Sequence, residues 1–186
     1  MTEPWKVVRW ISLFYSLLGL AGLGLWWWRS DSAEDFFPLG GPSEGLFWPG
    51  LAASIAIILF VVGLSRWLEK IWPAIPAALR DIRETLGPMN RWQVFLLAFF
   101  SSVGEELFFR AYLQMEIGLL AASVLFGLVH LPPNARWRLW PLFAIAMGFA
   151  LGLIYQWTQS LWFPILIHAG INYANLYHAV KTGRQK

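Results

Sequence analysis

Glu105, Glu106 and Arg110 occur within six residues, in the run EELFFR, inside a long apolar stretch. Glu106 and Arg110 are four residues apart, so they share one face of a helix and can form an ion pair. Glu105 lies about 100° further around the helix and has no partner at that spacing. A charge inside an apolar span costs about 2.5–3.5 kcal/mol on insertion scales, so an acid without a partner there indicates a function.

Two histidines and an asparagine provide the other polar groups in apolar surroundings. His130 ends the run FGLVH, four residues after Phe126, and His168 and Asn172 are four residues apart in the run HAGIN. A carboxylate, imidazoles, a carboxamide and a guanidinium are groups that enzymes use to activate water and to stabilise an oxyanion. The sequence contains no Cys, which excludes thiol catalysis.

The apolar runs around these residues predict membrane-spanning helices. The chain is 58% hydrophobic and only 13% charged, whereas a soluble domain has about 25% charged residues. A helix needs about 20 residues to cross the hydrocarbon core. Residues 139–180 contain no Asp, Glu, Lys or Arg, so this run must turn back once, at 156–160. We therefore predict an all-α polytopic membrane bundle with six spans, at about 10–28, 46–65, 92–114, 117–131, 139–156 and 160–178.

The predicted hairpin between the third and fourth spans brings Glu105 and His130 to the same depth, because both are equally far along the chain from its turn near 117–118. Gly127, one turn before His130, permits a close helix approach. Pro164 is expected to kink the sixth span. One pocket can then collect the candidate site residues Glu105, Glu106, Arg110, His130, His168 and Asn172.

Lysines and arginines predict the orientation of the bundle. With six spans, every Lys and Arg except Arg29 and Arg110 lies on the side of the two termini. Since positive residues favour the cytoplasmic side, we expect both termini to be cytoplasmic. The basic residues form no patch or motif typical of nucleic-acid binding, so no nucleic-acid partner is expected.

The whole chain, 1–186, is expected to form a single membrane domain. Residues 1–90 would provide two N-terminal spans and a cytoplasmic amphipathic linker, and residues 91–180 a four-helix catalytic core. Within the linker, 77–86 is typical of a short amphipathic helix that Gly87-Pro88 ends. This segment is either a plain connection on the membrane surface or a lid over the site.

The three motifs resemble those of the CPBP family, the membrane proteases related to the CAAX prenyl endopeptidase (Rce1-type) and the bacterial Abi proteins. The family pattern is Glu-Glu-x-x-x-Arg, Phe-x-x-x-His and His-x-x-x-Asn on three separate helices, and this sequence matches it in order and spacing over about 90–178. Ala111 is a departure, because the family often has glycine after the arginine. We expect that difference to alter helix packing and not the chemistry.

The resemblance implies an intramembrane endopeptidase of the glutamic type. It implies that Glu105 is the general base and that His130 helps to hold and polarise the water. The remaining roles that it implies are an oxyanion site for His168 and Asn172 and an orienting ion pair for Glu106 and Arg110.

The resemblance also implies a membrane-associated peptide or protein as substrate, in a multi-pass protein of a bacterial cytoplasmic membrane. No cofactor is expected, although Glu105, His130 and His168 could instead hold a zinc ion with one open position. Two other functions stay open: a non-catalytic scaffold, chaperone or immunity protein on the same fold, and a small ion or proton transporter with these groups as a relay. The sequence does not indicate an oligomeric state.

Overall fold

The computed structural model describes residues 4–29, 41–131 and 139–182 of the chain, and within them it is helical, with no strand. The elements are α1 (Pro4–Arg29), α2 (Phe47–Ile71), α3 (Ala74–Leu86), α4 (Arg91–Glu106), the π-helix η3 (Leu107–Leu113), α5 (Gln114–Leu128), α6 (Trp140–Thr158) and α7 (Trp162–Thr182). The predicted all-α class is confirmed.

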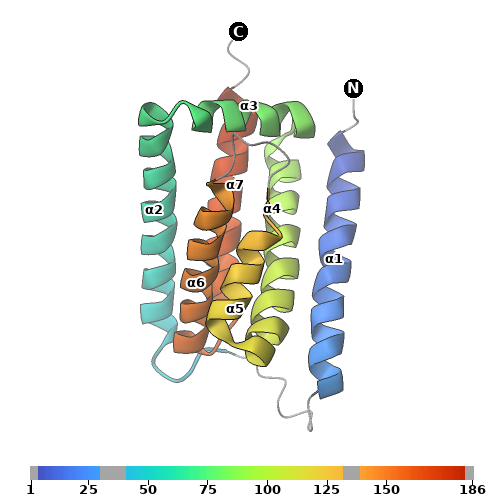
Figure 1. Cartoon of the computed structure of the whole chain (residues 1–186), viewed down its shortest axis with the longest axis vertical. Coiled ribbons are helices and arrows are strands. Elements are labelled where there is room, and N and C mark those ends of the chain that lie inside the picture. The colour runs from blue at the N-terminus through green and yellow to red at the C-terminus, as the bar shows by residue number, and fades with distance from the viewer. Residues whose placement is uncertain (1–3, 30–40, 132–138, 183–186) are drawn as a thin grey trace.

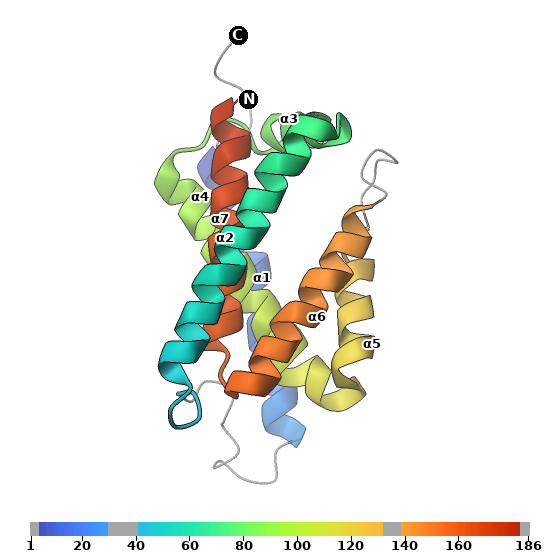
Figure 2. The same cartoon turned by 90° about the vertical axis from the view of Figure 1, so that its left-hand side faces the viewer.

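The long helices stand side by side, and α3 lies across one end of the bundle (Figure 1). The first residues of α1 and the last residues of α7 lie at this same end, as an even number of crossings requires. Figure 2 shows that α5 and α6 lean away from α2 and α7 towards the end where α3 lies. In the view of Figure 1 the elements that carry the candidate motifs lie between α1 and α2, and in Figure 2 α5 and α6 lie to one side of the other helices.

Four helical segments of the described chain are long and apolar enough to cross a membrane: Pro4–Arg29, Phe47–Ile71, Arg91–Leu128 and Trp140–Thr158. The third of these contains the third predicted span and most of the fourth. Helix α7, which carries His168 and Asn172, is not among the four. Large apolar side chains face outwards, such as Trp28 (82% exposed) and Phe60 (69% exposed). Apolar surface of this extent suits lipid and not water, so the protein is an integral membrane protein.

The hairpin between the third and fourth predicted spans turns at Gly118, where the sequence predicted a turn near 117–118. Gly118 has φ 81° and ψ 164°, a conformation open mainly to glycine, so the helical segment reverses there. On the returning arm, a side chain at Gly127 would meet the Pro141 carbonyl oxygen and Ile145 of α6. Gly127 thus permits the close approach of α5 and α6, as the sequence predicted.

The prediction that Pro164 kinks the last span is wrong. Helix α7 begins at Trp162, so Pro164 lies in its first turn. The first backbone N–H groups of a helix have no partner within the helix, and proline therefore costs nothing there. The turn between α6 and α7 lies in the region where the sequence predicted it, 156–160. Gln159, the residue after the end of α6, adopts the left-handed conformation there.

Helix α3 also begins earlier than predicted, at Ala74 instead of residue 77. Pro76 belongs to its first turn, where proline is tolerated, and Gly87 ends the helix with φ 73°. The next helix begins with a capping box, in which the Asn90 side chain accepts from the backbone of Gln93 and the Gln93 side chain accepts from the backbone N–H of Asn90. This box fixes the start of α4, the helix that ends at Glu106.

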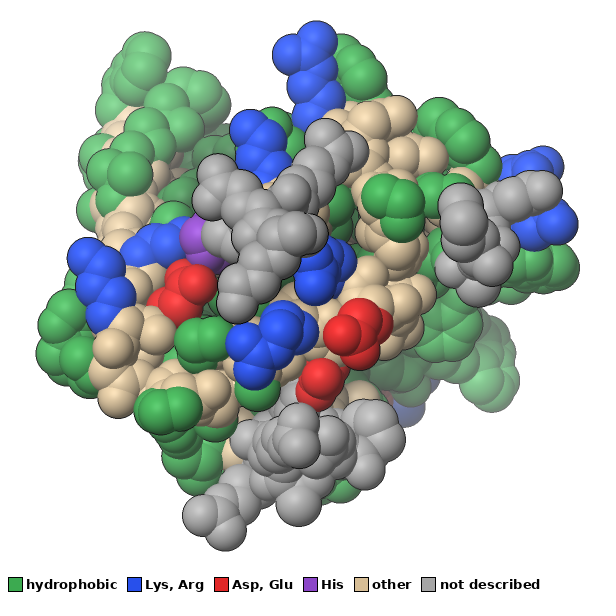
Figure 3. Space-filling model, turned by 90° about the horizontal axis from the view of Figure 1, so that it is seen from above, with side chains coloured by type: hydrophobic (Ala, Val, Ile, Leu, Met, Phe, Trp, Pro, Cys, Tyr) green, Lys and Arg blue, Asp and Glu red, His purple; other side chains and the backbone are tan. Residues whose placement is uncertain are grey.

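Seen from the α3 end, the molecule presents many Lys and Arg side chains with a few acids between them (Figure 3). His178 and Glu69 join α7 to α2 near this end through a 2.8 Å contact. At the opposite end, Arg29 pairs with Glu116 at 3.3 Å. Lysines and arginines that define the predicted cytoplasmic side thus gather at the α3 end. Four others that were counted for that side, Arg136, Arg138, Arg184 and Lys186, lie outside the described residues.

Candidate functional site

A buried chain of contacts joins Arg110, Glu106 and His168. The Arg110 Nε donates to Glu106 Oε2 at 3.0 Å, and His168 Nδ1 lies 2.8 Å from Glu106 Oε1. Glu106 and Arg110 are fully buried. Because the Glu106 carboxylate can only accept, His168 donates its Nδ1–H to it. The neutral His168 ring then carries its free lone pair on Nε2.

His130 is held in the same tautomer by a different acceptor. Its Nδ1 lies 2.6 Å from the carbonyl oxygen of Phe126, one turn earlier, so the Nδ1–H donates to that carbonyl. The Phe126 ring packs against the rings of His130 and His168, with centroids 4.6 and 5.9 Å away, and under the Arg110 guanidinium at 5.2 Å. Phe126 therefore positions three of the candidate groups at once.

Glu105 faces both free imidazole nitrogens. Its Oε2 lies 3.8 Å from His130 Nε2 and 3.7 Å from His168 Nε2. These distances are too long for direct hydrogen bonds, and they leave room for a bridging water or a reacting group. Glu105 Oε2 is buried and has no hydrogen-bond partner. An acceptor of this kind is a costly feature unless something else binds to it.

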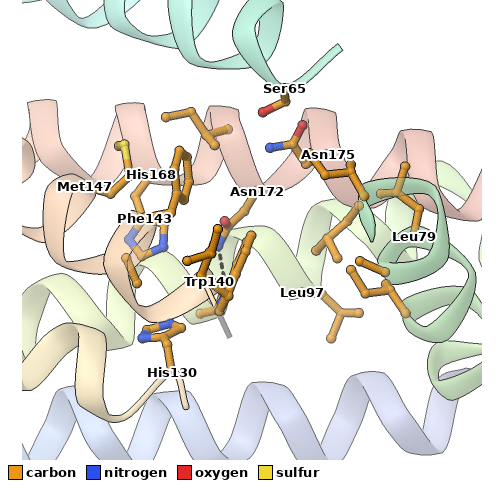
Figure 4. A pocket seen from close by; sticks show the side chains of 18 of the residues that line it. Ser65, Leu79, Leu97, His130, Trp140, Phe143, Met147, His168, Asn172 and Asn175 are labelled. Carbon is orange, nitrogen blue, oxygen red and sulfur yellow. Dashed lines mark hydrogen bonds between the residues drawn. The ribbon is translucent and has the colours of Figure 1, made fainter. Parts of the chain in front are cut away.

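These groups open onto a cavity of about 430 Å³. Figure 4 shows His130, from the end of α5, and His168 and Asn172, from α7, pointing into it. Side chains from α1, α2, α3, α4, α5, α6 and α7 line the cavity, and most of its wall is apolar. Its size is in the range of ligand-binding pockets, and a few polar groups in an apolar wall are typical of them.

Asn172 and Asn175 present further polar groups one and two turns along α7 from His168. The Asn172 Nδ2 donates to Ser101 Oγ at 3.3 Å, a long contact that a better acceptor could replace. The Asn175 Oδ1 is buried without a hydrogen-bond partner. Both asparagines line the cavity, so the polar stripe of α7 continues from the histidine towards α3.

The two adjacent acids lie at the point where α4 changes into the π-helix η3, Leu107–Leu113. Stretches of π-helix are rare and occur frequently at functional sites. Arg110 lies within this element, and its Nη1 and Nη2 are buried without hydrogen-bond partners. The Phe126 ring below the guanidinium is the group that compensates part of this cost.

The structure brings together all six residues that the sequence selected. Glu105, His130, His168 and Asn172 line the cavity, whereas Glu106 and Arg110 lie behind it and hold His168. The sequence missed Tyr15 of α1, which lines the same cavity as Glu105 and packs against Gly104, the residue before it. A polar side chain in the run 10–28 was a visible signal, but the sequence alone could not indicate its partner.

The donor set Glu105, His130 and His168 has one feature of a metal site. Each histidine donates its Nδ1–H to an acceptor and leaves Nε2 free, as metal-ligating histidines do. In the described part of the chain, however, no three His, Cys, Asp or Glu side chains are arranged to hold an ion.

Comparison with known proteins gives one family match and one relative. Residues 87–174 match the family model described as type II CAAX prenyl endopeptidase Rce1-like. The uncharacterised protein YpbD of Bacillus subtilis (strain 168) is 28% identical over 127 residues, which are 66% of this chain and 63% of YpbD. The chain thus spans less than two thirds of the length of that relative. No solved structure matches the chain.

Proposed function

We propose that this protein hydrolyses a peptide bond of a membrane-associated substrate with a water activated by Glu105. The match of residues 87–174 to the model of the type II CAAX prenyl endopeptidase Rce1-like family supports this proposal. The observation that carries this proposal is the buried Glu105 Oε2, which has no partner and faces two imidazole Nε2 atoms at 3.7 and 3.8 Å. Of these two nitrogens, His130 Nε2 has a free lone pair in the neutral ring and is the one that the proposed reaction uses as an acceptor.

In the proposed reaction, a water molecule lies between Glu105 and His130. Glu105 accepts a proton from this water while its oxygen attacks the carbonyl carbon of the scissile bond, and His130 Nε2 accepts the second water hydrogen as a hydrogen bond. The proton held by Glu105 then passes to the departing amine, so the C–N bond breaks and two peptide products form. General base catalysis of this kind contributes about 10²–10⁴-fold to a rate.

His168 and Asn172 are the proposed stabilisers of the oxyanion. Asn172 offers its Nδ2–H once a substrate oxygen replaces Ser101 as acceptor. His168 donates from Nε2 when its ring carries both protons, with its Nδ1–H still bonded to the Glu106 carboxylate. Fixed donors at a developing negative charge need no reorganisation during the reaction, which is why they stabilise the transition state.

The apolar wall of the cavity favours a hydrophobic or membrane-anchored peptide as substrate. The residues on the α3 side include Leu79 and Ile82, and α3 lies at the end where Lys and Arg side chains gather. We propose that substrate reaches the site from the cytoplasmic half of a bacterial cytoplasmic membrane. A zinc-dependent form of the same hydrolysis is the second candidate, supported by the tautomers of His130 and His168.

The test is cleavage of a fluorogenic peptide library by the purified protein in reconstituted membranes. Glu105→Ala removes the proposed base, and Glu116→Gln, an acid near the opposite end that pairs with Arg29, is the control. All three proteins are first shown to have the same melting temperature within a few degrees. Cut positions, read by mass spectrometry, identify the substrate sequence.

Cleavage by the wild type and by Glu116→Gln, with none by Glu105→Ala, is the expected result. Equal cleavage by the wild type and Glu105→Ala would overturn the assignment of the base. Absence of cleavage across membrane-anchored and soluble peptides alike would favour a non-catalytic scaffold on this fold.

A further inference from the structure

We propose that Tyr15, on α1, is a positioning residue that orients the Glu105 carboxylate for catalysis. This inference rests on the proposed function, because it assigns Glu105 the role of the base. Tyr15 lies outside residues 87–174, the part of the chain that matches the family model. The site would therefore be completed by a helix that the family motifs do not include.

Helix α1 packs very closely against the end of α4 at the level of Glu105. A side chain at Gly104, the residue before Glu105, would meet the backbone carbonyl and the Cβ of Tyr15. One turn along α1, a side chain at Gly19 would meet the Gly104 Cα and Leu107. Small residues on both helices thus let the two backbones approach closely, which fixes the position of Tyr15 relative to Glu105.

In the inferred arrangement, the Tyr15 hydroxyl donates a hydrogen bond to the Glu105 carboxylate from this position. Tyr15 interacts electrostatically with Glu105 and lines the same cavity as Glu105, His130 and His168. The Tyr15 ring lies edge-on to the ring of the neighbouring Phe14, with centroids 5.1 Å apart. A rigid aromatic side chain on a fixed helix is well suited to hold the more flexible glutamate.

The contact from Tyr15 leaves the reactive oxygen free. Glu105 Oε2, the atom that faces both imidazoles, has no hydrogen-bond partner. A hydroxyl can only donate to a carboxylate, so Tyr15 fixes the plane of the group while Oε2 stays open to accept a proton. Without this bond the Glu105 side chain could adopt other rotamers, in which Oε2 no longer faces His130 and His168.

The first test compares the kinetics of Tyr15→Phe with those of the wild type on a cleaved peptide. Tyr155→Phe is the matched control, since Tyr155 is a buried tyrosine of α6 that packs with Leu107, Leu161 and Ile165. We expect kcat of Tyr15→Phe to fall about ten- to a hundredfold, as for loss of a hydrogen bond to a charged group, with KM unchanged. The control is expected to keep both constants.

The second test needs no activity, so it separates this inference from the proposed function. The melting temperature is measured for the wild type, Tyr15→Phe, E105A and the double variant Tyr15→Phe/E105A. If the hydroxyl and the carboxylate are bonded, Tyr15→Phe lowers the melting temperature of the wild type and has little effect in the E105A background.

Equal effects of Tyr15→Phe in both backgrounds would overturn the inference, whether or not any peptide is cleaved. A kcat of Tyr15→Phe equal to that of the wild type would overturn the inference as well. Coupled melting temperatures in a protein that cleaves nothing would support the contact and count against the proposed hydrolysis alone.

Discussion

Replacing Glu106 with glutamine tests whether the buried ion pair behind the cavity holds the fold together. Glu106 and Arg110 are both fully buried, and Nη1 and Nη2 of Arg110 have no other hydrogen-bond partner. Glu106→Gln keeps the shape of the side chain and an acceptor for His168, but it leaves Arg110 as a buried cation without an anion. Breaking such a pair costs about 3–5 kcal/mol.

For a chain of this size, that loss lowers the melting temperature by roughly 6–20 °C. Tryptophan fluorescence follows the unfolding in detergent micelles, since 13 tryptophans are distributed along the chain. The double variant Glu106→Gln/Arg110→Met removes both charges and is expected to regain most of the lost stability. Glu69→Gln, in the partly exposed contact with His178, is the matched control and should cost less than about 1 kcal/mol.

A cost below about 1 kcal/mol for Glu106→Gln would refute this reasoning, because a buried cation would then carry no penalty. A double variant as unstable as the single variant would refute it too. In that case the loss would come from packing around residue 106 and not from the unpaired charge.

Three further predictions concern packing, substrate binding and metal. Gly104→Ala should destabilise the protein by about 1–3 kcal/mol in thermal unfolding, because the new methyl group meets the Tyr15 carbonyl; Gly63→Ala, with open space around it, should not. Leu79→Glu, on the α3 wall of the cavity, should raise KM about tenfold or more with little change in kcat, whereas Arg80→Ala, on the exposed side of α3, should change neither. A strong chelator should leave peptide cleavage unchanged; a loss of activity that zinc restores would show the zinc-dependent form.

The sequence predicted the membrane bundle and the convergence of its polar residues because both follow from simple patterns. Long apolar runs fix helices in a bilayer, and the equal distances of Glu105 and His130 from the hairpin turn placed them at the same depth. Spacing of four residues likewise predicted the Glu106–Arg110 pair, which forms at 3.0 Å.

Contacts between distant segments could not be predicted in the same way. The bond between Glu106 and His168 and the approach of Tyr15 to the site depend on which helices are neighbours, and one sequence does not give that order. The π-helix at Leu107–Leu113 was missed as well, because no local pattern distinguishes it from an ordinary helix. Pro164 was misjudged because its effect depends on where α7 begins.

The most direct test of the central claim is the turnover number of Glu105→Gln on the peptide identified from the library, in the same membranes as the wild type. Glutamine keeps the size of Glu105 and its ability to accept from Tyr15, but it cannot take a proton from water. The proposed mechanism predicts a fall in kcat of about 10²–10⁴-fold in a protein that remains folded. A kcat within a few-fold of the wild type would contradict it, because another group would then have to activate the water.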